Sequence, residues 1–339
     1  MNTLLLSSCD EDIEKAAEII KNGGLVAMPT ETVYGLGADA FNEAAVKEIF
    51  VAKGRAQDNP LIVHISRLDE LKPLVKDIPH SALRLALKFW PGPLTLILKK
   101  SDLIPNSVTC GMDTVAVRMP AHPIAKRLIA KSGCPIAAPS ANISGGVSPV
   151  SAEHCIKDLN GRIDAVIDGG KCKVGLESTI VLTTSDRPRL LRPGLITKEQ
   201  IESCLNCKID VDDAILNPLK DGEKPLSPGM KYKHYSPDAK VIIIDAMPNV
   251  YQCYVNQHKD TGVYALCFKE DKEKLRVPYI CYGDENDDAT QAAGLFDAMR
   301  KLDELGAKTV YARMPKPDGV GLAVLNRLLR AAGFEVIKP

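Results

Sequence analysis

Short apolar runs alternate with amphipathic segments of helical period along most of this chain, and this alternation is what most restricts its fold. The first helix is expected over 11–22, with Asp10 as its N-cap. Its apolar positions share one face and are Ile13, Ala16, Ala17 and Ile20. The run Leu25-Val-Ala-Met28 that follows is typical of a buried strand. Helices with one apolar face and strands that are apolar throughout predict an α/β protein, in which helices cover a sheet.

The same pattern predicts two groups of elements. In the first group, strands are expected at 4–6, 25–28, 61–65, 94–99, 115–118, 136–138, 165–167, 179–182 and 189–191. Helices of this group are expected at 11–22, 43–51, 81–89, 123–131, 152–159 and 198–205. In the second group, strands are expected at 241–244, 263–267, 277–281, 309–312 and 335–337, and helices at 248–258, 290–304 and 322–332. The order of the second group implies a mostly parallel sheet covered by helices.

The stretch between the two groups, 207–238, has four prolines and two glycines but little periodicity, which is typical of a linker. With 339 residues the chain is also long for one domain. We therefore expect an N-terminal domain over 1–206, a linker over 207–238, and a smaller Rossmann-like domain with a parallel sheet over 239–339.

Charge and cysteine content exclude several classes of protein. The formal net charge is zero, with 43 basic and 43 acidic residues, so the chain lacks the overall positive field of a nucleic-acid-binding protein. No apolar run approaches the roughly 20 residues needed to cross a bilayer, and no signal-peptide pattern is seen at the N-terminus. The ten cysteines are scattered, and Cys204-Leu-Asn-Cys207 has no second pair to complete a zinc site. We expect a cytoplasmic protein with reduced thiols and no contact with a membrane.

Polar and cationic residues gather in the loops that follow the predicted strands. The loop Pro29-Thr-Glu-Thr-Val-Tyr34 is rich in hydroxyls, and Gly35 and Gly37 after it are expected to permit backbone turns. Lys53 and Arg55 place two fixed cations on one later loop, which suits a polyanion such as a triphosphate. Since open α/β sheets bind ligands at strand ends, these loops are candidates for a binding site.

The candidate site residues recur at successive strand exits. They are Thr32, Lys53, Arg55, Asn59, His64, Arg118, Ser140, Asn142, Ser178 and Arg192. Each also has a purely structural explanation: an arginine can pair at the surface, and a histidine in an apolar strand can be a hydrogen-bonded core residue. Their recurrence at neighbouring strand ends is what favours a shared site.

Familiar catalytic and nucleotide-binding signatures are missing from the sequence. There is no GxxxxGK[ST] loop, and the glycines at 35 and 37 are too few for a dinucleotide fingerprint. There is also no GxSxG nucleophile elbow and no HExxH zinc helix. What the chain offers instead is several strand-end loops with small polar or cationic groups.

Several segments resemble motifs of the threonylcarbamoyl-AMP synthase family, which is the YrdC-like family. Lys53-Gly-Arg55 and Pro139-Ser-Ala-Asn142 are similar to the lysine–arginine and serine–asparagine pairs that mark this family. Other similar segments are Pro29-Thr-Glu-Thr-Val-Tyr-Gly-Leu36, Trp90-Pro-Gly-Pro-Leu-Thr95, Gly175-Leu-Glu-Ser-Thr179 and Leu191-Arg-Pro-Gly194. Ser227-Pro-Gly-Met-Lys-Tyr-Lys-His-Tyr-Ser-Pro237 resembles the linker of the family's long form, which has an extra C-terminal domain. The resemblance covers essentially the whole chain.

The resemblance implies a fold, an activity and partners. The fold is a twisted open α/β sheet around a large cationic cavity, followed by the smaller domain. The activity is the condensation of L-threonine, bicarbonate and ATP into L-threonylcarbamoyl-AMP with release of pyrophosphate, the first step of threonylcarbamoyladenosine (t6A) modification of tRNA. A separate tRNA threonylcarbamoyl transferase complex would accept the product, and any direct contact with RNA would be weak. Mg²⁺ would accompany ATP, and no metal ligands from the protein are expected.

The resemblance also assigns roles by matched position. Residues implied in catalysis are Lys53, Arg55, Ser140 and Asn142. Residues implied in threonine binding are Thr32, His64, Arg118, Ala138 and Ser178. Residues implied in ATP binding are Arg55, Asn59, Thr114, Ser140, Ser148, Arg192 and Tyr235.

Physical chemistry agrees with these roles. The carboxylate of threonine requires a bidentate partner such as Arg118. A carbamate that attacks an α-phosphate brings two anions together, so Lys53, Arg55 and Mg²⁺ are expected to lower an electrostatic barrier. Because carbamates hydrolyse easily, Lys231-Tyr-Lys-His-Tyr235 in the linker is expected to act as a lid rather than as a solvated tether.

Two alternatives remain at this point. A cationic concavity in such a fold can hold RNA, although zero net charge and the lack of interleaved aromatic residues argue against an RNA-binding module. The carbamoyl-transferring enzymes of hydrogenase maturation share the first domain. They carry acylphosphatase-like and zinc-finger regions for which this chain has neither the length nor the cysteine pairs.

Overall fold

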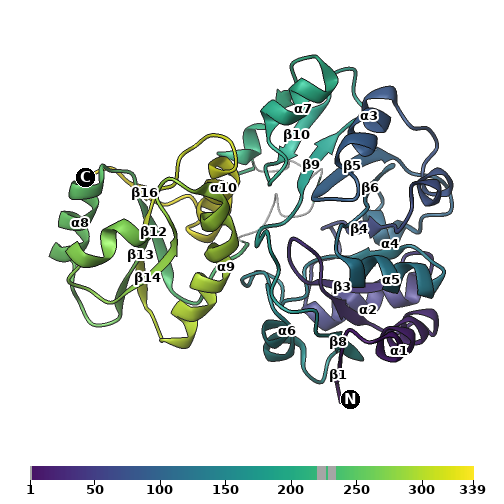
Figure 1. Ribbon diagram of the computed structural model, residues 1–339, viewed down its shortest axis with the longest axis horizontal. Coiled ribbons are helices and arrows are strands. Elements are labelled where there is room, and N and C mark those ends of the chain that lie inside the picture. The colour runs from purple at the N-terminus through teal and green to yellow at the C-terminus, as the bar shows by residue number, and fades with distance from the viewer. Residues whose placement is uncertain (1, 220–226, 228–233) are drawn as a thin grey trace.

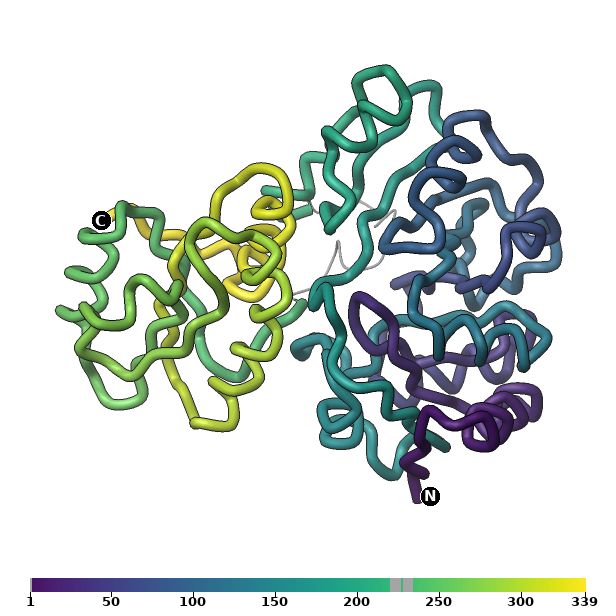
Figure 2. Tube along the Cα trace, in the orientation of Figure 1, coloured from purple at the N-terminus to yellow at the C-terminus, as the bar shows by residue number. Residues whose placement is uncertain are grey.

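The computed structural model describes residues 2–219, 227 and 234–339. In these residues the chain forms one large mixed sheet and one smaller parallel sheet, and Figure 1 shows the two sheets side by side, each with its own helices. Figure 2 shows that the two chain termini lie on different parts of the molecule, the N-terminus on the larger and the C-terminus on the smaller.

The larger sheet has eleven strands within the described residues. In spatial order they are β1 (Leu4–Leu6), β8 (Ala165–Ile167), β2 (Val26–Met28), β3 (Gly35–Asp39), β7 (Ile136–Ala138), β4 (Ile62–His64), β6 (Thr114–Arg118), β5 (Leu94–Lys99), β9 (Thr179–Leu182), β10 (Arg189–Arg192) and β11 (Asp210–Val211). The associated helices are α1 (Asp10–Lys21), α2 (Glu43–Lys53), α3 (His80–Phe89), α4 (Asn106–Thr109), α5 (Pro123–Ser132), α6 (Ala152–Leu159) and α7 (Lys198–Leu205), with short 3-10 helices at Leu68–Leu74 and Asp213–Ile215.

One face of the larger sheet is covered by helices only over part of its width. At the β1–β7 end, α1 and α5 pack on this face through an apolar cluster that includes Ile13, Ile20 and Leu128. Further along, the same face carries a small cluster made only of strand residues, among them Ile62 and Ala116. The opposite face carries the main core, to which α2, α3 and α6 contribute. The sheet therefore has a face on β4, β6, β5 and β9 at which polar side chains can gather.

The smaller sheet has five strands, and all of its pairs are parallel. In spatial order the strands are β14 (Tyr279–Gly283), β13 (Val263–Phe268), β15 (Thr309–Arg313), β12 (Lys240–Ile244) and β16 (Val336–Ile337). Its helices are α8 (Pro248–Gln257), α9 (Asp288–Glu304) and α10 (Gly321–Ala331), with a 3-10 helix at Lys269–Lys274. In Figure 1, α8 lies at the far side of this sheet, whereas α9 and α10 lie toward the larger sheet.

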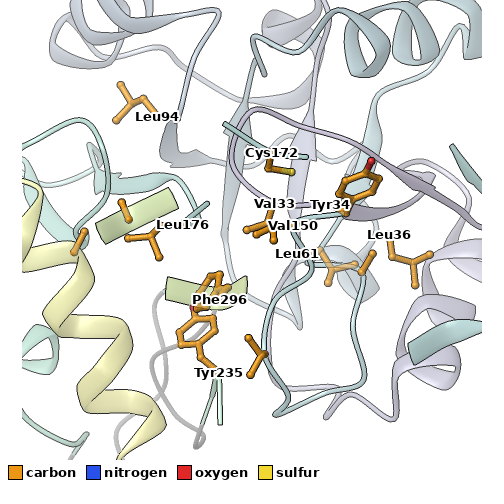
Figure 3. Close-up of a cluster of buried hydrophobic side chains, with 14 of the residues drawn as sticks. Val33, Tyr34, Leu36, Leu61, Leu94, Val150, Cys172, Leu176, Tyr235 and Phe296 are labelled. Carbon is orange, nitrogen blue, oxygen red and sulfur yellow. The ribbon is translucent and has the colours of Figure 1, made fainter. Parts of the chain in front are cut away.

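The two sheets share one apolar core. A single cluster of buried residues contains residues of α2 and α3 as well as residues of α9 and α10. Tyr235 belongs to the same cluster, and its ring lies 5.3 Å from that of Phe296 in α9, centroid to centroid. Figure 3 shows this pair, with Leu176 and Val150 of the larger part drawn nearby. The packing therefore joins the two parts through the end of the linker.

Most of the predicted elements are present, with boundaries within two residues of those expected. Two local predictions are wrong. Asp10 does not cap α1, because Cys9 occupies the N-cap position and the Asp10 carboxylate pairs with Arg127 of α5. Gly35 and Gly37 do not make turns, since both lie in strand β3.

The glycines of β3 are explained by close packing between strands. A Cβ on Gly37 would lie 2.7 Å from Cγ2 of Ile136, and one on Gly35 would lie 3.3 Å from Cβ of Ala138. β3 pairs antiparallel with β2 and β7. It therefore lies between two neighbouring strands, where there is little room for a side chain. Glycine is thus required there for space rather than for a positive φ.

One further difference concerns the stretch predicted as a linker. Short elements at Asp210–Val211 and Asp213–Ile215 lie inside the stretch predicted as a linker, and Ile209 and Ile215 are buried.

In the part of the chain that the structure describes, no helix is both long and apolar enough to span a membrane.

Candidate functional site

The register of the larger sheet brings several predicted site residues onto the open face. His64 of β4 is paired with Arg118 of β6, and Arg118 is paired with Thr95 of β5. Side chains alternate along a strand, so Ile62 and Ala116, two residues before His64 and Arg118, lie on the same face. This face therefore carries a polar row beside an apolar row.

A pocket with about 600 Å³ of empty space lies at this face. Its lining residues are Thr30, Thr32, Val33, Gly35, Arg55, Ile62, His64, Arg118, Ala138, Pro139, Ser140, Glu177, Ser178, Arg192, His234 and Tyr235. Three of these residues are arginines from different loops and strands. A pocket with few, well-placed charges is typical of a site for a small polar ligand.

Arg118 is held in place from three sides. Its Nη1 donates to Oγ1 of Thr32 at 2.9 Å, and its Nη2 forms an ion pair with Oε1 of Glu31 at 2.6 Å. Nε donates to the carbonyl of Gly92 at 3.3 Å. A guanidinium has five N–H groups, so these contacts leave one on each terminal nitrogen for a ligand carboxylate.

Glu31, whose side chain is 12% exposed, is the counter-ion of Arg118. Burial raises the pKa of its carboxyl, but the charge and hydrogen bond of Arg118 outweigh burial, and the pKa lies below its ordinary value. The second oxygen of Glu31 accepts a hydrogen bond from the backbone of Ala121 at 3.1 Å. The ion pair therefore fixes the direction of Arg118 before any ligand arrives.

Ser178 and Arg192 form a second polar group on the wall of the pocket. Nε of Arg192 donates to the carbonyl of Ser178 at 3.0 Å, and its Nη2 donates to the Ser178 hydroxyl at 3.2 Å. The same hydroxyl lies 2.7 Å from Oγ1 of Thr95. Burial lowers the pKa of Arg192. Among the described residues no carboxylate forms an ion pair with Arg192, and a buried cation of this kind suits an anionic ligand.

Arg55 closes the pocket on another side. Its Nε donates to the carbonyl of Asn59 and its Nη2 to the carbonyl of Pro60, both at 3.0 Å. Burial lowers the pKa of Arg55 to about 10. Asn59 is buried, and its Oδ1 has no hydrogen-bond partner within the described residues. Arg55 therefore fixes the loop that contains Asn59 and Pro60. Within the described residues, Oδ1 of Asn59 is an acceptor that receives no hydrogen bond.

Lys53 is turned away from the pocket and supports the neighbouring loop. Its Nζ donates to the carbonyl of Ser140 at 2.5 Å and also to that of Asn142. The Ser140 hydroxyl donates to Oδ1 of Asn142 at 2.5 Å, and the Asn142 amide donates to the carbonyl of Gly146 at 2.8 Å. Burial, followed by the charge of Arg55, lowers the pKa of Lys53 well below its ordinary value. Lys53 therefore orders the loop that presents Ser140.

Glu177 links the pocket wall to both parts of the molecule. Its Oε1 accepts a hydrogen bond from Ser148 at 2.5 Å, and its Oε2 accepts one from Nε of Arg327 in α10 at 2.8 Å. Burial raises the pKa of this carboxyl, but Arg327 and then Arg192 outweigh burial, so the pKa lies below its ordinary value. Glu177 is therefore an anion in a largely cationic pocket.

Two histidines of the pocket are held in the neutral form. Burial, and then the charge of Arg118, lowers the pKa of His64 to about 3. Burial, and then the charge of Arg55, lowers the pKa of His234 to about 3 as well. At neutral pH both rings act as hydrogen-bonding groups without charge.

The structure brings most of the predicted site residues together. Those that line the pocket are Thr32, Arg55, His64, Arg118, Ala138, Ser140, Ser178, Arg192 and Tyr235. Those that do not line it are Lys53, Asn59, Thr114, Asn142 and Ser148. Thr114 begins β6 on the same face as Arg118, about 13 Å farther along the strand. A ligand bound at Arg118 would have to be longer than an amino acid to reach Thr114.

Sequence reasoning missed the acidic residues of the site and the contribution of α10. Glu31 and Glu177 lie inside segments that resemble family motifs, at Pro29–Leu36 and Gly175–Thr179, and that position was the only signal for them. Arg327 lies in an ordinary amphipathic helix and had no signal. The predicted lid is described only at His234 and Tyr235, which line the pocket, because Lys231, Tyr232 and Lys233 lie outside the described residues.

The described residues offer no ready-made metal site. No group of three or more His, Cys, Asp or Glu side chains among them is arranged to hold a metal ion. Glu177, the carboxylate that lines the pocket, already binds Arg327 and Ser148. These residues therefore do not fit a dedicated Mg²⁺ site.

The fold and the pocket define a two-domain α/β protein with a cationic small-ligand site on the open face of its larger sheet. The family model Sua5/YciO/YrdC, described as "Telomere recombination", matches residues 18–194. A second model, described as "Threonylcarbamoyl-AMP synthase, C-terminal domain", matches residues 196–333.

Relatives of known name match the chain over nearly its whole length. The threonylcarbamoyl-AMP synthase of Bacillus subtilis is 47% identical over 98% of this chain and 96% of its own. That of Pyrococcus abyssi is 45% identical over 96% of this chain and 95% of its own. The crystal structure of P. abyssi Sua5 complexed with L-threonine superposes with a TM-score of 0.89, covers all of both chains, and is 43% identical. The chain belongs to the threonylcarbamoyl-AMP synthase family, in the long form with a C-terminal domain.

Proposed function

We propose that this chain synthesises L-threonylcarbamoyl-AMP from L-threonine, bicarbonate and ATP and releases pyrophosphate, the first step of t6A modification of tRNA. The observation that carries the proposal is that Arg55, Arg118, Ser140 and Arg192 line one pocket in a chain that matches the family from end to end. The solved relative that binds L-threonine supports an amino-acid site of this kind.

The threonine end of the pocket is assigned to the polar row of the sheet. Arg118, fixed by Glu31 and Thr32, would bind the carboxylate with its two remaining N–H groups. Neutral His64 and the Ser178 hydroxyl would bind the polar groups of the substrate, and Ala138 would border its side chain. Because Arg118 is already oriented, little ordering would be needed when threonine binds.

The nucleotide end is assigned to the part of the same pocket that Arg55, Ser140 and Arg192 line. Arg55 and Arg192 would neutralise charge that develops as the carbamate approaches the α-phosphate. Ser140 is presented by the loop that Lys53 and Asn142 hold, and Asn59 offers an unused acceptor. Thr114, Ser148 and Tyr235 would extend the contacts to the rest of ATP. Mg²⁺ is proposed to arrive with the triphosphate, where it would screen phosphate charge.

The linker is proposed to cover the reacting groups. His234 and Tyr235 already line the pocket, and Tyr235 is packed against Phe296 of α9. A cover of this kind would keep water from the labile carbamate. The division into a catalytic part over 1–206, a linker over 207–238 and a second domain over 239–339 also remains a proposal, as does a location in the cytoplasm.

The product is proposed to pass to a separate tRNA threonylcarbamoyl transferase complex. A mixed anhydride of a carbamate and AMP is reactive and carries its own leaving group, so a second enzyme can transfer the threonylcarbamoyl group without further ATP. We also propose that this chain contacts RNA weakly. The pocket is cationic, but the whole chain has no net charge to attract the phosphates of RNA.

The direct test is pyrophosphate release measured with L-threonine, bicarbonate and ATP together and with each omitted in turn. Release that requires all three supports the proposal. Salt-sensitive RNA binding without pyrophosphate release would instead favour an RNA-binding module.

Arg55→Ala is the first variant to measure. Removal of a cation aimed at developing phosphate charge is expected to lower the rate of pyrophosphate release by about 10²-fold or more. Arg67→Ala is a matched control, since Arg67 is exposed and pairs with Asp69. Full activity of Arg55→Ala would rule out the phosphate role.

A further inference from the structure

The buried ion pair between Arg327 and Glu177 joins the C-terminal domain to the wall of the pocket. Arg327 lies on α10 and is fully buried, and its Nε reaches Oε2 of Glu177 at 2.8 Å. Glu177 itself lines the pocket. A cation from the second domain is therefore fixed directly behind the wall of a site that the first domain forms.

Arg327 also binds the two backbone segments that make up this wall. Its Nη1 donates to the carbonyl of Pro193 at 3.0 Å, and its Nη2 donates to that of Glu177 at 3.3 Å. Pro193 directly follows Arg192, and Glu177 directly precedes Ser178. The planar guanidinium thus connects the start of β9 with the end of β10, and both places carry a proposed ligand contact.

The charge of Arg327 affects what Arg192 can bind. Glu177 is buried, and Arg327 and Arg192 are the two cations that act most strongly on its carboxylate. Loss of Arg327 would leave this buried carboxylate without its main partner, which is unfavourable. Arg192 would then be drawn toward Glu177 and away from a ligand.

Two further contacts connect Arg327 with the nucleotide end. Its Cζ stands 5.6 Å from the centre of the Tyr235 ring, a cation–π contact. Glu177, which Arg327 holds, accepts the hydrogen bond from Ser148. Ser148, Arg192 and Tyr235 are all proposed contacts of ATP. Tyr235 contacts Arg327 directly, and Ser148 donates to Glu177, which Arg327 binds. Arg192 adjoins Pro193, whose carbonyl accepts a hydrogen bond from Arg327.

We propose that Arg327 is a positioning residue of the nucleotide site that the C-terminal domain supplies. By neutralising Glu177 and holding the carbonyl of Pro193, it keeps Arg192 directed at the ligand. This inference rests on the proposed function and gives the second domain a part in binding ATP rather than threonine.

The test compares Arg327→Ala with Arg313→Ala in the full chain. Arg313 is the control: it is also a buried arginine of the second domain, but it pairs with Asp271 and Glu285 of that same domain and does not line the pocket. Calorimetry with α,β-methylene-ATP and with L-threonine measures the two halves of the site separately. Arg327→Ala is expected to weaken binding of the ATP analogue by about tenfold or more and to change threonine binding by less than about threefold.

A second variant separates the loss of charge from the loss of packing. Glu177→Gln added to Arg327→Ala removes the unpaired carboxylate, so part of the affinity for α,β-methylene-ATP should return. Hydrogen exchange of residues 176–183 and 190–196 should accelerate in Arg327→Ala and stay near wild type in Arg313→Ala. The exchange measurement does not depend on catalysis or on bound nucleotide.

Several results would overturn the inference. Unchanged affinity for the ATP analogue in Arg327→Ala, with normal binding by the wild type, would refute it while leaving the proposed function intact. Equal losses in Arg327→Ala and Arg313→Ala, without rescue by Glu177→Gln, would mean that Arg327 only stabilises the second domain. A wild type that binds neither α,β-methylene-ATP nor L-threonine would refute the proposed function itself.

Discussion

Arg118 illustrates how one side chain combines structural and functional demands. It is buried at the end of β6, where Glu31 balances its charge and Thr32 fixes one terminal nitrogen. A buried guanidinium without such partners would be unfavourable, and one with all five N–H groups engaged could not bind a substrate. The observed contacts compensate the buried charge of Arg118 and leave two N–H donors for a substrate.

Arg118→Ala is expected to weaken L-threonine binding by about 1.5–3 kcal/mol, the range for hydrogen bonds to a charged group. Calorimetric titration with L-threonine measures this change directly. Arg127→Ala serves as a control, because Arg127 pairs with Asp10 away from the pocket. An unchanged titration would contradict the assigned carboxylate contact.

The buried histidines predict how stability depends on pH. His64 and His234 have a pKa of about 3 in the folded protein, compared with 6.5 for an ordinary histidine. Between these values the unfolded chain binds more protons, so their contribution to stability is complete above about pH 6.5 and is lost as the pH falls toward 3.

Each of these two histidines is expected to lower the free energy of unfolding by about 2 kcal/mol between pH 6.5 and 5. Urea unfolding at the two pH values measures the difference. His64→Gln should reduce the difference by about 2 kcal/mol, and His80→Gln, at an exposed position, should leave it unchanged. An equal pH effect in wild type and His64→Gln would refute this account.

At the scale of elements, the loop before β9 is positioned by its close contact with α9. Gly175 has φ +77°, and a Cβ there would lie 2.6 Å from the backbone of Ala292 and Ala293. Since Glu177 follows two residues later, the approach of α9 also determines where this part of the pocket wall lies. Glycine is needed both for its backbone conformation and for space.

Gly175→Ala and Gly170→Ala form a matched pair that separates these two requirements. Gly170 has nearly the same φ, +78°, but a Cβ there would meet nothing within 4 Å. Gly170→Ala should therefore lose only the conformational term, about 1–2 kcal/mol. Gly175→Ala should lose a further ~1–3 kcal/mol, because α9 must shift. Chemical denaturation measures both, and equal losses would show that the contact with α9 is unimportant.

At the scale of the whole molecule, the second domain contributes to the structure of the first. Arg300 binds Asp158 of α6 through both terminal nitrogens at 3.0 and 2.7 Å. Asn326 of α10 donates to the carbonyl of Ile215 at 2.7 Å. Together with the shared apolar core, these contacts make the interface a part of the folded protein rather than a loose tether.

Truncation after Asn217 tests this dependence. The end point retains the short elements up to Ile215 and removes the rest of the linker and the second domain. We expect a folded fragment with a lower melting temperature, because the apolar faces of α9 and α10 no longer cover the core. Threonine binding should be retained and pyrophosphate release strongly reduced. Undiminished release would show that neither the linker nor the second domain serves the reaction.

Much of the fold and part of the site could be predicted from the sequence because they depend on local pattern. The apolar face of α1 follows from a 3.6-residue period, and the cap of α2 follows from Asn42, whose side chain accepts a hydrogen bond from Ala45. Arg118 and Arg192 were recognisable as candidates because Arg118 ends one predicted strand and Arg192 directly follows another, and strand ends meet in an α/β sheet.

What only the tertiary structure decided are the contacts between distant parts of the chain. β3 could not be recognised as a strand, because its glycines are required by the side chains of β7, which follow about a hundred residues later. Lys53 has the composition of a ligand-binding cation but turns to the carbonyls of Ser140 and Asn142. Arg327 and Glu177 meet across 150 residues. Local sequence specifies helices and strands through their periodicity, whereas the pairing of buried charges depends on the order of strands and on the docking of one domain against the other.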